Sequence, residues 1–415
     1  MWKRVPWMSK SFAISAAKFL VSVLAVTLLA SIGGARAESD RIIYAFHGDT
    51  DGAYPQAGLI VDKDGNFYGI TQLGGGNGGT VFKLTAGGTE TVLYAFRPRT
   101  RGRQPVGSLI LDKRGNLYGT TSEGGRCTIS RRGCGTVFQL SPVGVEALLY
   151  SFQGGSDGAQ PFAGLIADDA GNLFGTTASG DPYGGGTIFE LAPNGSETVL
   201  HAFLGGSDGA FPFAELISDT AGNFYGTTFG GGGTGCGDGC GTVFKLASDG
   251  TETILHSFAG GNDGTNPWSA LIIDKAGNLY GTTLLGGTGC SEGNCGIVFK
   301  VAPDGTENVL HSFARGKDGA EPEAGLISDN AGNLYGTTGA GGSSGCNGDG
   351  CGTVFKLTPD GHETVLHAFE GGTDGRGPES QLILDKAGNL YGTTASGGSS
   401  GCNGYGCGTV FSLRR

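Results

Sequence analysis

The sequence has 415 residues and a formal net charge of −11. This acidic balance argues against general nucleic-acid binding, which needs basic side chains to neutralise phosphates. Glycine contributes 84 residues, but the sequence has neither the three-residue period nor the proline content of collagen. Glycine therefore indicates frequent turns between short elements.

The first 37 residues have the organisation of a secretory signal peptide. Basic residues precede an apolar run over residues 19–32, and Ala35-Arg36-Ala37 follows as a cleavage motif. An uncleaved membrane anchor is the alternative. Later in the chain, no apolar stretch approaches the ~20 residues that span a bilayer. We therefore expect residues 38–415 to be secreted, or held in the periplasm or at the cell surface, with 22 basic and 38 acidic residues.

Residues 38–415 contain seven copies of one unit. The motif "DKDGNFYGIT" at Asp62 recurs six more times, and its asparagines are 50 to 56 residues apart, at Asn66, Asn116, Asn172, Asn223, Asn278, Asn333 and Asn389. A period of this length favours propeller blades over solenoid coils. Each copy contains four short predicted strands, A to D, separated by turn signals. In the fifth copy these are residues 269–274, 279–283, 296–301 and 307–313.

The two ends of the repeat region complement each other. Residues 41–46 resemble a D strand without strands A to C of its own, and the chain finishes on a C strand, residues 408–413. Pairing these two segments would remove exposed sheet edges. The sequence therefore predicts an all-β, seven-bladed propeller of four-stranded blades over residues 38–415, closed by the N-terminal D strand. A β-helix is the alternative, but it would need shorter rungs.

The recurring motifs "GNLYGTT", "GTVFKL" and "ETVLHAF" resemble the Gloeo-Verruco tandem repeat of secreted bacterial proteins with varied surface anchors. The resemblance covers essentially all of residues 38–415. It implies a repeat architecture outside the cytoplasm and no particular activity.

Ten cysteines form five local pairs, each between strands B and C of one copy: Cys127/Cys134, Cys236/Cys240, Cys290/Cys295, Cys346/Cys351 and Cys402/Cys407. Their even number, their local pairing and the predicted export favour five disulfides. A metal site and a redox couple are the alternatives. Zinc normally has four ligands, and no histidine lies within these loops. A redox couple usually has the shorter C-x-x-C spacing.

Residues that recur in every copy are interpreted as structural. The loops with the pattern GGxDG each offer one carboxylate (Asp157, Asp208, Asp263, Asp318 and Asp374), whereas calcium takes six to eight oxygens. We expect a turn role, with calcium as the alternative and no other metal or cofactor. One D-strand position holds either tyrosine or histidine, which indicates packing. The sequence has no catalytic triad, nucleophile elbow or P-loop.

The D–A loops and the B–C loops, with their cysteine pairs, are expected to share one face, and the position after each D–A proline should lie at the mouth of the central channel. This position varies between the copies: Gln56, Val106, Phe162, Phe213, Trp268, Glu323 and Glu379. Glu215 adds an acid on an inner strand. Aromatic faces beside carboxylates suit a sugar or a cationic ligand. The alternative is that these side chains only fill the channel and bind no ligand.

The second copy differs from the others by its arginines, which we expect to converge at one corner of the loop face: Arg97, Arg99, Arg101, Arg103, Arg126, Arg131 and Arg132. Guanidinium groups match carboxylate, sulfate and phosphate groups. An anionic polysaccharide, lipopolysaccharide or an acidic protein would fit this corner. A solvated basic loop is the alternative.

Three functions follow as hypotheses. The first is a monomeric, secreted binding or scaffold module whose loop face contacts a glycan or an acidic macromolecule, with no nucleic acid and no membrane span in the mature chain. The second is an enzyme on extracellular polysaccharide, either a glycosidase using Glu323 and Glu379, with Glu215 as a further acid, or a lyase using the arginines. The third is a purely structural envelope protein.

Overall fold

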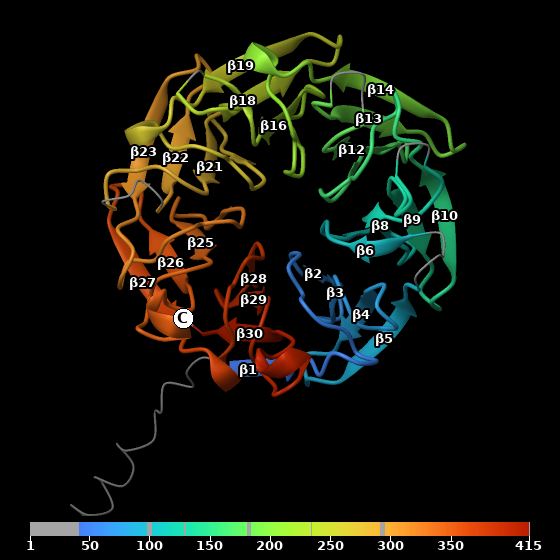
Figure 1. The fold of residues 1–415 in the computed structure, drawn as a ribbon, viewed down its shortest axis with the longest axis vertical. Helices are drawn as coiled ribbons and strands as arrows, with labels where there is room; N and C mark the ends of the chain where they lie inside the picture. The colour runs from blue at the N-terminus through green and yellow to red at the C-terminus, as the bar shows by residue number, and fades with distance from the viewer. Residues whose placement is uncertain are drawn as a thin grey trace, which may run out of the picture. The chain divides into compact units, whose positions relative to one another are not determined.

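The computed structural model describes residues 41–97, 102–127, 130–180, 184–233, 235–290 and 295–414. Within residues 41–413, seven sheets are arranged around a ring, and each sheet runs from an inner to an outer strand (Figure 1). The predicted seven-bladed propeller is confirmed. The predicted signal peptide lies outside the described residues and stays a prediction.

Strands B, C and D form the body of each blade. The B strands are β3 (Phe67–Thr71), β8 (Leu117–Glu123), β12 (Leu173–Thr177), β16 (Phe224–Thr228), β21 (Leu279–Thr283), β25 (Leu334–Thr338) and β29 (Leu390–Thr394). The C strands are β4 (Thr80–Leu84), β9 (Thr136–Leu140), β13 (Thr187–Leu191), β18 (Gly239–Leu246), β22 (Ile297–Val301), β26 (Thr353–Leu357) and β30 (Thr409–Leu413). The D strands are β5 (Glu90–Ala95), β10 (Glu146–Ser151), β14 (Glu197–Ala202), β19 (Glu252–Ser257), β23 (Glu307–Ser312), β27 (Glu363–Ala368) and β1 (Arg41–Ala45).

The A strands are shorter than the sequence suggested. They are β2 (Ile60–Val61), β7 (Ile110–Leu111), β11 (Ile166–Ala167), β15 (Ile217–Ser218), β20 (Ile272–Ile273), β24 (Ile327–Ser328) and β28 (Ile383–Leu384). In the fifth blade only Ile272 and Ile273 pair with the B strand. The residues before them line the central channel, and Asp274 already belongs to the A–B turn.

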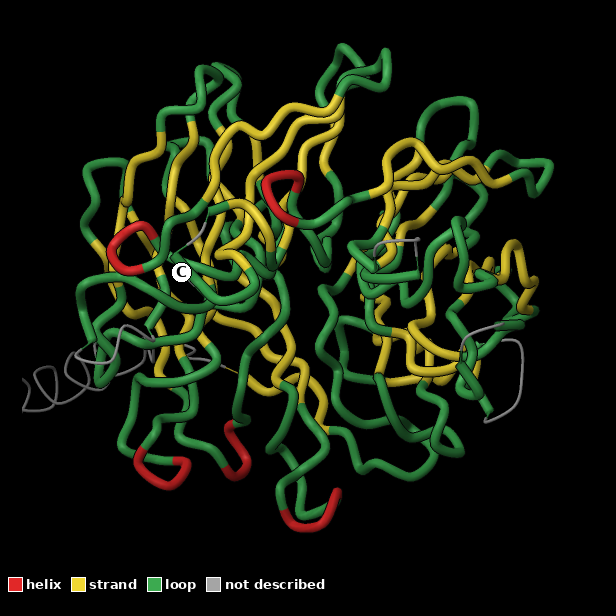
Figure 2. The backbone as a smooth tube through the Cα atoms, turned by 45° about the horizontal axis from the view of Figure 1, so that its top comes forward, coloured by secondary structure: helices red, strands yellow, loops and turns green. Residues whose placement is uncertain are grey.

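Loops connect these short strands and carry the remaining regular elements (Figure 2). Two further strands are β6 (Arg103–Pro105) and β17 (Gly231–Gly232), and the short helices are η1 (Gly206–Asp208), η2 (Gly261–Asp263), η3 (Cys346–Gly348), η4 (Gly372–Asp374) and η5 (Cys402–Gly404). A search of the described residues for a helix able to cross a membrane finds none.

The A–B turn is fixed by the aspartate that begins each repeat motif. In the first blade the Asp62 carboxylate accepts the backbone N–H groups of Asp64 and Asn66, the Asn66 amide and the Tyr68 hydroxyl, at 2.9 to 3.0 Å. Burial alone would raise the pKa of Asp62, but these hydrogen bonds lower it. These contacts agree with the structural role expected of residues that recur in every copy.

The core consists of phenylalanine pairs between neighbouring blades. The phenylalanine that follows each D strand meets the C-strand phenylalanine of the next blade edge to face, with ring centroids 5.1 to 5.2 Å apart. Both rings of every pair are fully buried. Such pairs add about 0.5–1.5 kcal/mol each beyond the hydrophobic area that they bury. Seven equivalent contacts therefore join the seven blades.

The glycine of each "GTT" motif, which is "GIT" in the first blade, makes room for this core. A Cβ atom at Gly226 would lie 2.6 Å from the ring of Phe244, and the equivalent distance is 2.6 to 2.8 Å in all seven blades. Real Cβ contacts are essentially never that close, so the B strand can carry only glycine there.

The ring closes where β1 pairs with β30. Arg41 lies opposite Ser412, and Ala45 lies opposite Thr409. Phe46, which follows β1, continues the inter-blade core by packing against Phe82 of the first blade. The predicted closure by the N-terminal D strand is confirmed.

Candidate site at the mouth of the central channel

The D–A and B–C loops share one face of the propeller, called the loop face below. The backbone N–H of Gly287 in a B–C loop donates to the carbonyl of Gly261 in the D–A loop of the same blade at 2.8 Å. Gly398 and Gly372 form the equivalent bond at 2.7 Å. The predicted arrangement of these loops is confirmed.

The D–A loops are folded around their aspartates. The Asp51 carboxylate accepts the backbone N–H groups of His47 and Gly48 at 2.9 and 3.0 Å, and the Tyr44 hydroxyl at 2.9 Å. Burial would raise the pKa of Asp51, but these bonds lower it. The contacts fit the predicted turn role, and calcium binding stays an untested alternative.

The tyrosine or histidine position of the D strand serves the same loop. Tyr44 and Tyr150 bond Asp51 and Asp157 through their hydroxyl groups, while the His256 ring nitrogen lies 3.1 Å from Asp263. Each ring also packs edge-on against the phenylalanine two residues later. Either ring type can fill this position because both offer an apolar body and a polar tip. The predicted packing role is therefore confirmed, with a hydrogen bond added to it.

A glutamate at the start of the next D strand completes this group, and sequence reasoning missed it. In five blades one buried carboxyl oxygen of this glutamate has no hydrogen-bond partner among the described residues: Glu90, Glu197, Glu252, Glu307 and Glu363. Burial, followed by the charge of the neighbouring aspartate, raises the pKa of Glu252 to about 7. Because the glutamate recurs in the repeat, the sequence does not distinguish it from the residues that have only a structural role.

The five predicted disulfides are all present, with Cα–Cα distances of 5.1 to 6.0 Å: Cys127–Cys134, Cys236–Cys240, Cys290–Cys295, Cys346–Cys351 and Cys402–Cys407. They lie against the D–A loop of the next blade. A Cβ atom at Gly48 would lie 2.7 Å from both sulfur atoms of the last pair, so glycine is needed where the loop crosses the disulfide. Gly205 follows a blade without cysteines, and a Cβ atom there would contact nothing within 4 Å.

The second cysteine of each pair belongs to the core. Its exposed fraction is at most 1% in all five pairs: Cys134, Cys240, Cys295, Cys351 and Cys407. Cys295 packs in the same core cluster as Phe313, and Cys351 packs in the same core cluster as Phe369. The reason is that this cysteine lies within the buried C strand or two positions before it, whereas the first cysteine lies further out along the loop. Cys295 and Cys351 therefore anchor their loops to the core and offer no surface to a ligand.

The residue before each D–A proline connects these loops to the channel. In six blades it is a residue other than glycine with φ of 53° to 60°: Tyr54, Gln104, Gln160, Phe211, Asn266 and Glu321. Non-glycine residues adopt this conformation at a cost in free energy, and such positions cluster at functional sites. The Asn266 backbone N–H donates to the Cys240 carbonyl of the preceding blade at 2.8 Å. The channel-mouth residue follows two positions later.

The seven residues after the prolines come together at the channel, as predicted from the topology. Gln56, Val106, Phe162, Phe213, Trp268, Glu323 and Glu379 all line one central cavity of about 120 Å³. Glu215 lines the same cavity. The predicted ligand-binding residues are therefore neighbours in space.

Blades three to five form an aromatic sector of this mouth. The rings of Phe213 and Trp268 are stacked, with centroids 4.6 Å apart and an interplanar angle of 25°. Phe162 meets Phe213 edge to face at 5.5 Å. Trp268 is 39% exposed and Phe211 is 37% exposed, so aromatic surface faces solvent here.

Sequence reasoning missed two members of this sector. Phe229 directly follows strand β16 and contacts both Phe213 and Trp268, at 5.5 and 5.4 Å between ring centroids. Phe211 precedes the D–A proline and lies parallel to Phe213 at 6.5 Å. The available signal was that both positions are aromatic in the fourth blade and polar or small in most other blades.

Blades six and seven form an acidic sector. Burial, then the charges of Glu379 and Glu321, raises the pKa of Glu323 to about 8. Burial also raises the pKa of Glu379, opposed by the Gln56 amide, which donates to its carboxyl at 2.6 Å, and by Arg376. Burial raises the pKa of Glu215 to about 7. All three carboxyl groups are therefore weaker acids than a solvent-exposed glutamate.

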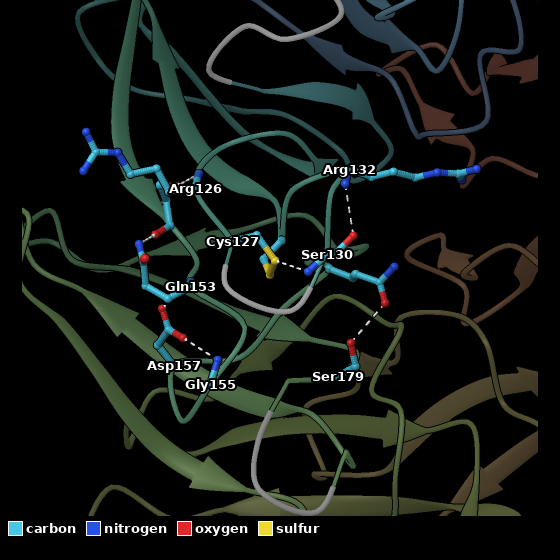
Figure 3. Close-up of a disulfide and its surroundings, with 11 residues drawn as sticks. Arg126, Cys127, Ser130, Arg132, Gln153, Gly155, Asp157 and Ser179 are labelled. Atoms are coloured by element: carbon cyan, nitrogen blue, oxygen red, sulfur yellow. Dashed lines mark hydrogen bonds between the residues drawn. A yellow bond between two sulfur atoms is a disulfide. The ribbon is translucent and has the colours of Figure 1, made fainter.

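The arginines of the second blade are less concentrated than the sequence suggested. Arg103 and Arg132 both pair with Glu123, a buried residue at the end of strand β8 that sequence reasoning overlooked. Arg126 and Arg132 point away from each other on opposite sides of the Cys127–Cys134 disulfide (Figure 3). Arg131 is exposed and Arg97 lies at the edge of a described range, while Arg99 and Arg101 lie outside the described residues.

Comparison with protein families gives one match. The family model of the Gloeobacter/Verrucomicrobia repeat covers residues 34–239 and 237–415. The chain belongs to this family. The resemblance of its motifs to this family is thereby confirmed. Its seven copies of the repeat form the seven blades of one closed ring. Comparison with curated proteins finds no match.

Solved structures similar to this family member support the fold. Virginiamycin B lyase from Staphylococcus aureus aligns with a TM-score of 0.58 and 11% identity, over 89% of this chain and 97% of the lyase. The extracellular domain of a B. thetaiotaomicron protein assigned to the one-component systems aligns with a TM-score of 0.52 and 15% identity, over 88% of this chain and 40% of that one. At these identities the likeness establishes the propeller fold alone.

Proposed function

We propose that this chain is an exported glycan-binding module and that the channel mouth is its contact surface. The observation that carries the proposal is the partly exposed aromatic sector, Phe211, Phe213 and Trp268, in a mouth whose other side carries carboxyl and amide groups. The seven mouth positions hold different residues although the surrounding frame repeats. A packing role alone does not require aromatic rings that reach solvent at the variable positions of this face.

The chemistry of this mouth matches that of a sugar ring. A pyranose has an apolar C–H face, which packs on flat aromatic rings, and hydroxyl groups at its edge, which need hydrogen-bond partners. Trp268 offers an exposed flat surface of the first kind. Gln56 and Glu379 offer an amide and a carboxyl group of the second kind, and Glu323, with its raised pKa, can also donate a proton in a hydrogen bond.

The loops that carry these residues are held in place before a ligand arrives. Disulfides support the D–A loops, and their aspartates bond the backbone of the same loops. Preformed loops lose little conformational entropy on binding, which favours affinity. The five disulfides are consistent with an oxidising compartment, and together with the basic and apolar residues at the start of the sequence they support export.

The channel mouth is a better candidate than the arginines of the second blade. Glu123 neutralises two of the described arginines, and Figure 3 shows Arg126 and Arg132 diverging rather than converging on one ligand. Contact with an anionic partner at Arg126 and Arg131 would be secondary to the mouth.

A glycan array probed with residues 38–415 tests this proposal. We expect binding to a defined group of polysaccharides, without release of reducing ends or of unsaturated products. A pair of carboxyl groups, such as Glu323 and Glu379, is also what a glycoside hydrolase uses. Release of products would therefore show that the protein is an enzyme and not a binding module. A lack of binding to every glycan would favour a purely structural protein.

A further inference from the structure

If the channel mouth binds glycans, its charge indicates which glycans it takes. We infer that the ligand is a polysaccharide with free amino groups, whose sugar ring packs on Trp268 and whose ammonium group enters the channel toward Glu323 and Glu379. This inference rests on the proposed function and specifies its substrate class.

The first argument is an excess of acid in the channel. Glu215, Glu323 and Glu379 line the same cavity of about 120 Å³, and among its described lining residues there is neither lysine nor arginine. Arg315, in the loop that leads to the sixth blade, is engaged by Glu321 at 2.8 Å. Arg376 acts on Glu379 only electrostatically. A cationic ligand group would therefore be the only positive charge among the described groups that line this cavity, and it would favour the ionised form of these carboxyl groups.

The second argument is the state of Glu215. Glu215 lines the channel and keeps part of its surface exposed, and no hydrogen bond or ion pair reaches its carboxyl group from the described residues. A Cβ atom at Gly164 of the neighbouring blade would lie 2.7 Å from one of its oxygens. An accessible carboxyl group without a partner among the described residues can pair with a polar or charged ligand group that enters the channel.

The third argument is the order of residues around the mouth. Trp268 of the fifth blade is followed by Glu323 of the sixth and Glu379 of the seventh, so the aromatic and acidic sectors adjoin. A cation is attracted both to the face of an indole ring and to a carboxylate. This combination distinguishes an amino sugar from a neutral or a uronic one.

Protonation of the acidic sector gives an independent signature. In the free protein, burial and the mutual repulsion of Glu323, Glu379 and Glu321 raise the pKa of Glu323 to about 8, and burial raises that of Glu215 to about 7. A bound cation favours the ionised carboxylates. Binding of an amino sugar should thus release protons, and binding of its N-acetylated form should not.

The experiment compares the glucosamine tetramer with the N-acetylglucosamine tetramer by calorimetry at pH 6.5, in buffers of different ionisation enthalpy. We expect the amino tetramer to bind at least about tenfold more tightly, a difference of ~1.4 kcal/mol, with proton release. Glu323→Gln should reduce the preference to below about threefold. Glu370→Gln, which changes an exposed acid of a D–A loop, is the matched control and should keep it.

Three outcomes would overturn the inference. Equal binding of the two tetramers would leave the proposed function standing and remove the amino-sugar preference. Retention of the full preference in the Glu323→Gln variant would show that the channel acids do not create it. Lack of binding of either tetramer, together with binding of another glycan class on the array, would also exclude amino sugars, whereas lack of binding to any glycan would remove the proposed function as well.

Discussion

The frame of the propeller and its channel mouth use the same repeat differently. In the frame, which is the set of residues that recur in every blade, one phenylalanine pair and one turn aspartate are present in all seven blades, and the pair keeps its edge-to-face contact while the aspartate keeps its bonds to backbone N–H groups. At the mouth, the residue after each proline occupies an equivalent place in every blade but ranges from tryptophan to glutamate. The frame thus supplies seven fixed positions, and chemistry enters through the side chains placed there.

The largest effect that separates these regions should be on stability. Phe258→Ala removes a fully buried ring that packs against Phe299, and should destabilise the propeller by ~3–5 kcal/mol. Trp268→Ala at the mouth removes a partly exposed ring and should cost well under half of that. Denaturant unfolding of both variants measures the difference. Equal losses would mean that the mouth aromatics belong to the core.

A glycine pair in the fourth blade tests the frame more finely. Gly226→Ala would place a Cβ atom 2.6 Å from the Phe244 ring, and should destabilise the protein by ~1–3 kcal/mol. Gly237→Ala is the matched control, because a Cβ atom there meets nothing within 4 Å. Thermal unfolding should show a lower Tm for Gly226→Ala alone. A similar Tm for both variants would contradict the close packing described for the B strand.

The smallest effect concerns the glutamates between the blades. Burial and the Asp208 charge raise the pKa of Glu252 from 4.5 to about 7, so the folded state holds this proton more tightly than the unfolded chain. The resulting stability is complete below the unfolded pKa and is lost as the pH rises through 7. The propeller should therefore unfold at a higher temperature at pH 5 than at pH 8. Aspartates such as Asp263, whose pKa is lowered, act in the opposite direction only at more acidic pH.

A substitution at this position makes the pH effect specific. Glu252→Gln should reduce the difference between pH 5 and pH 8 by ~1 kcal/mol, a modest value because the side chain is only half-buried and solvent screens it. Glu370→Gln, an exposed change, should leave the difference intact. An unchanged pH dependence in both variants would show that the inter-blade glutamates do not carry it.

The fold could be predicted because each structural motif occurs seven times in the sequence. Asp62 and its equivalents mark the A–B turn, and residues 41–46 have no partner unless the ring closes. The length of the A strands could not be predicted, since residues such as Ser269 have strand-like neighbours but lie at the channel instead of pairing. The cysteine pairing could be predicted from spacing, but the burial of Cys295 and Cys351 could not, because it depends on how the neighbouring blade packs.

The candidate site could be located from the sequence but not completed. Variation after the prolines identified Trp268 and Glu323, because the frame around them is constant. Phe229 was missed because it enters the mouth from a B–C loop, and only the folded blade brings it against Trp268. Glu123 was missed because its pairing with Arg103 joins residues twenty positions apart, across strands β6 and β8.

The affinity of two aromatic variants for a glycan that the protein binds tests most directly whether the channel mouth is the binding site. Trp268→Ala changes the exposed ring at the channel mouth, whereas Tyr405→Ala changes a ring that is 69% exposed and does not line the channel. We expect Trp268→Ala to weaken binding at least about tenfold, or ~1.4 kcal/mol, and Tyr405→Ala to leave it unchanged. Unchanged affinity in Trp268→Ala, or an equal loss in both variants, would contradict binding at the channel mouth.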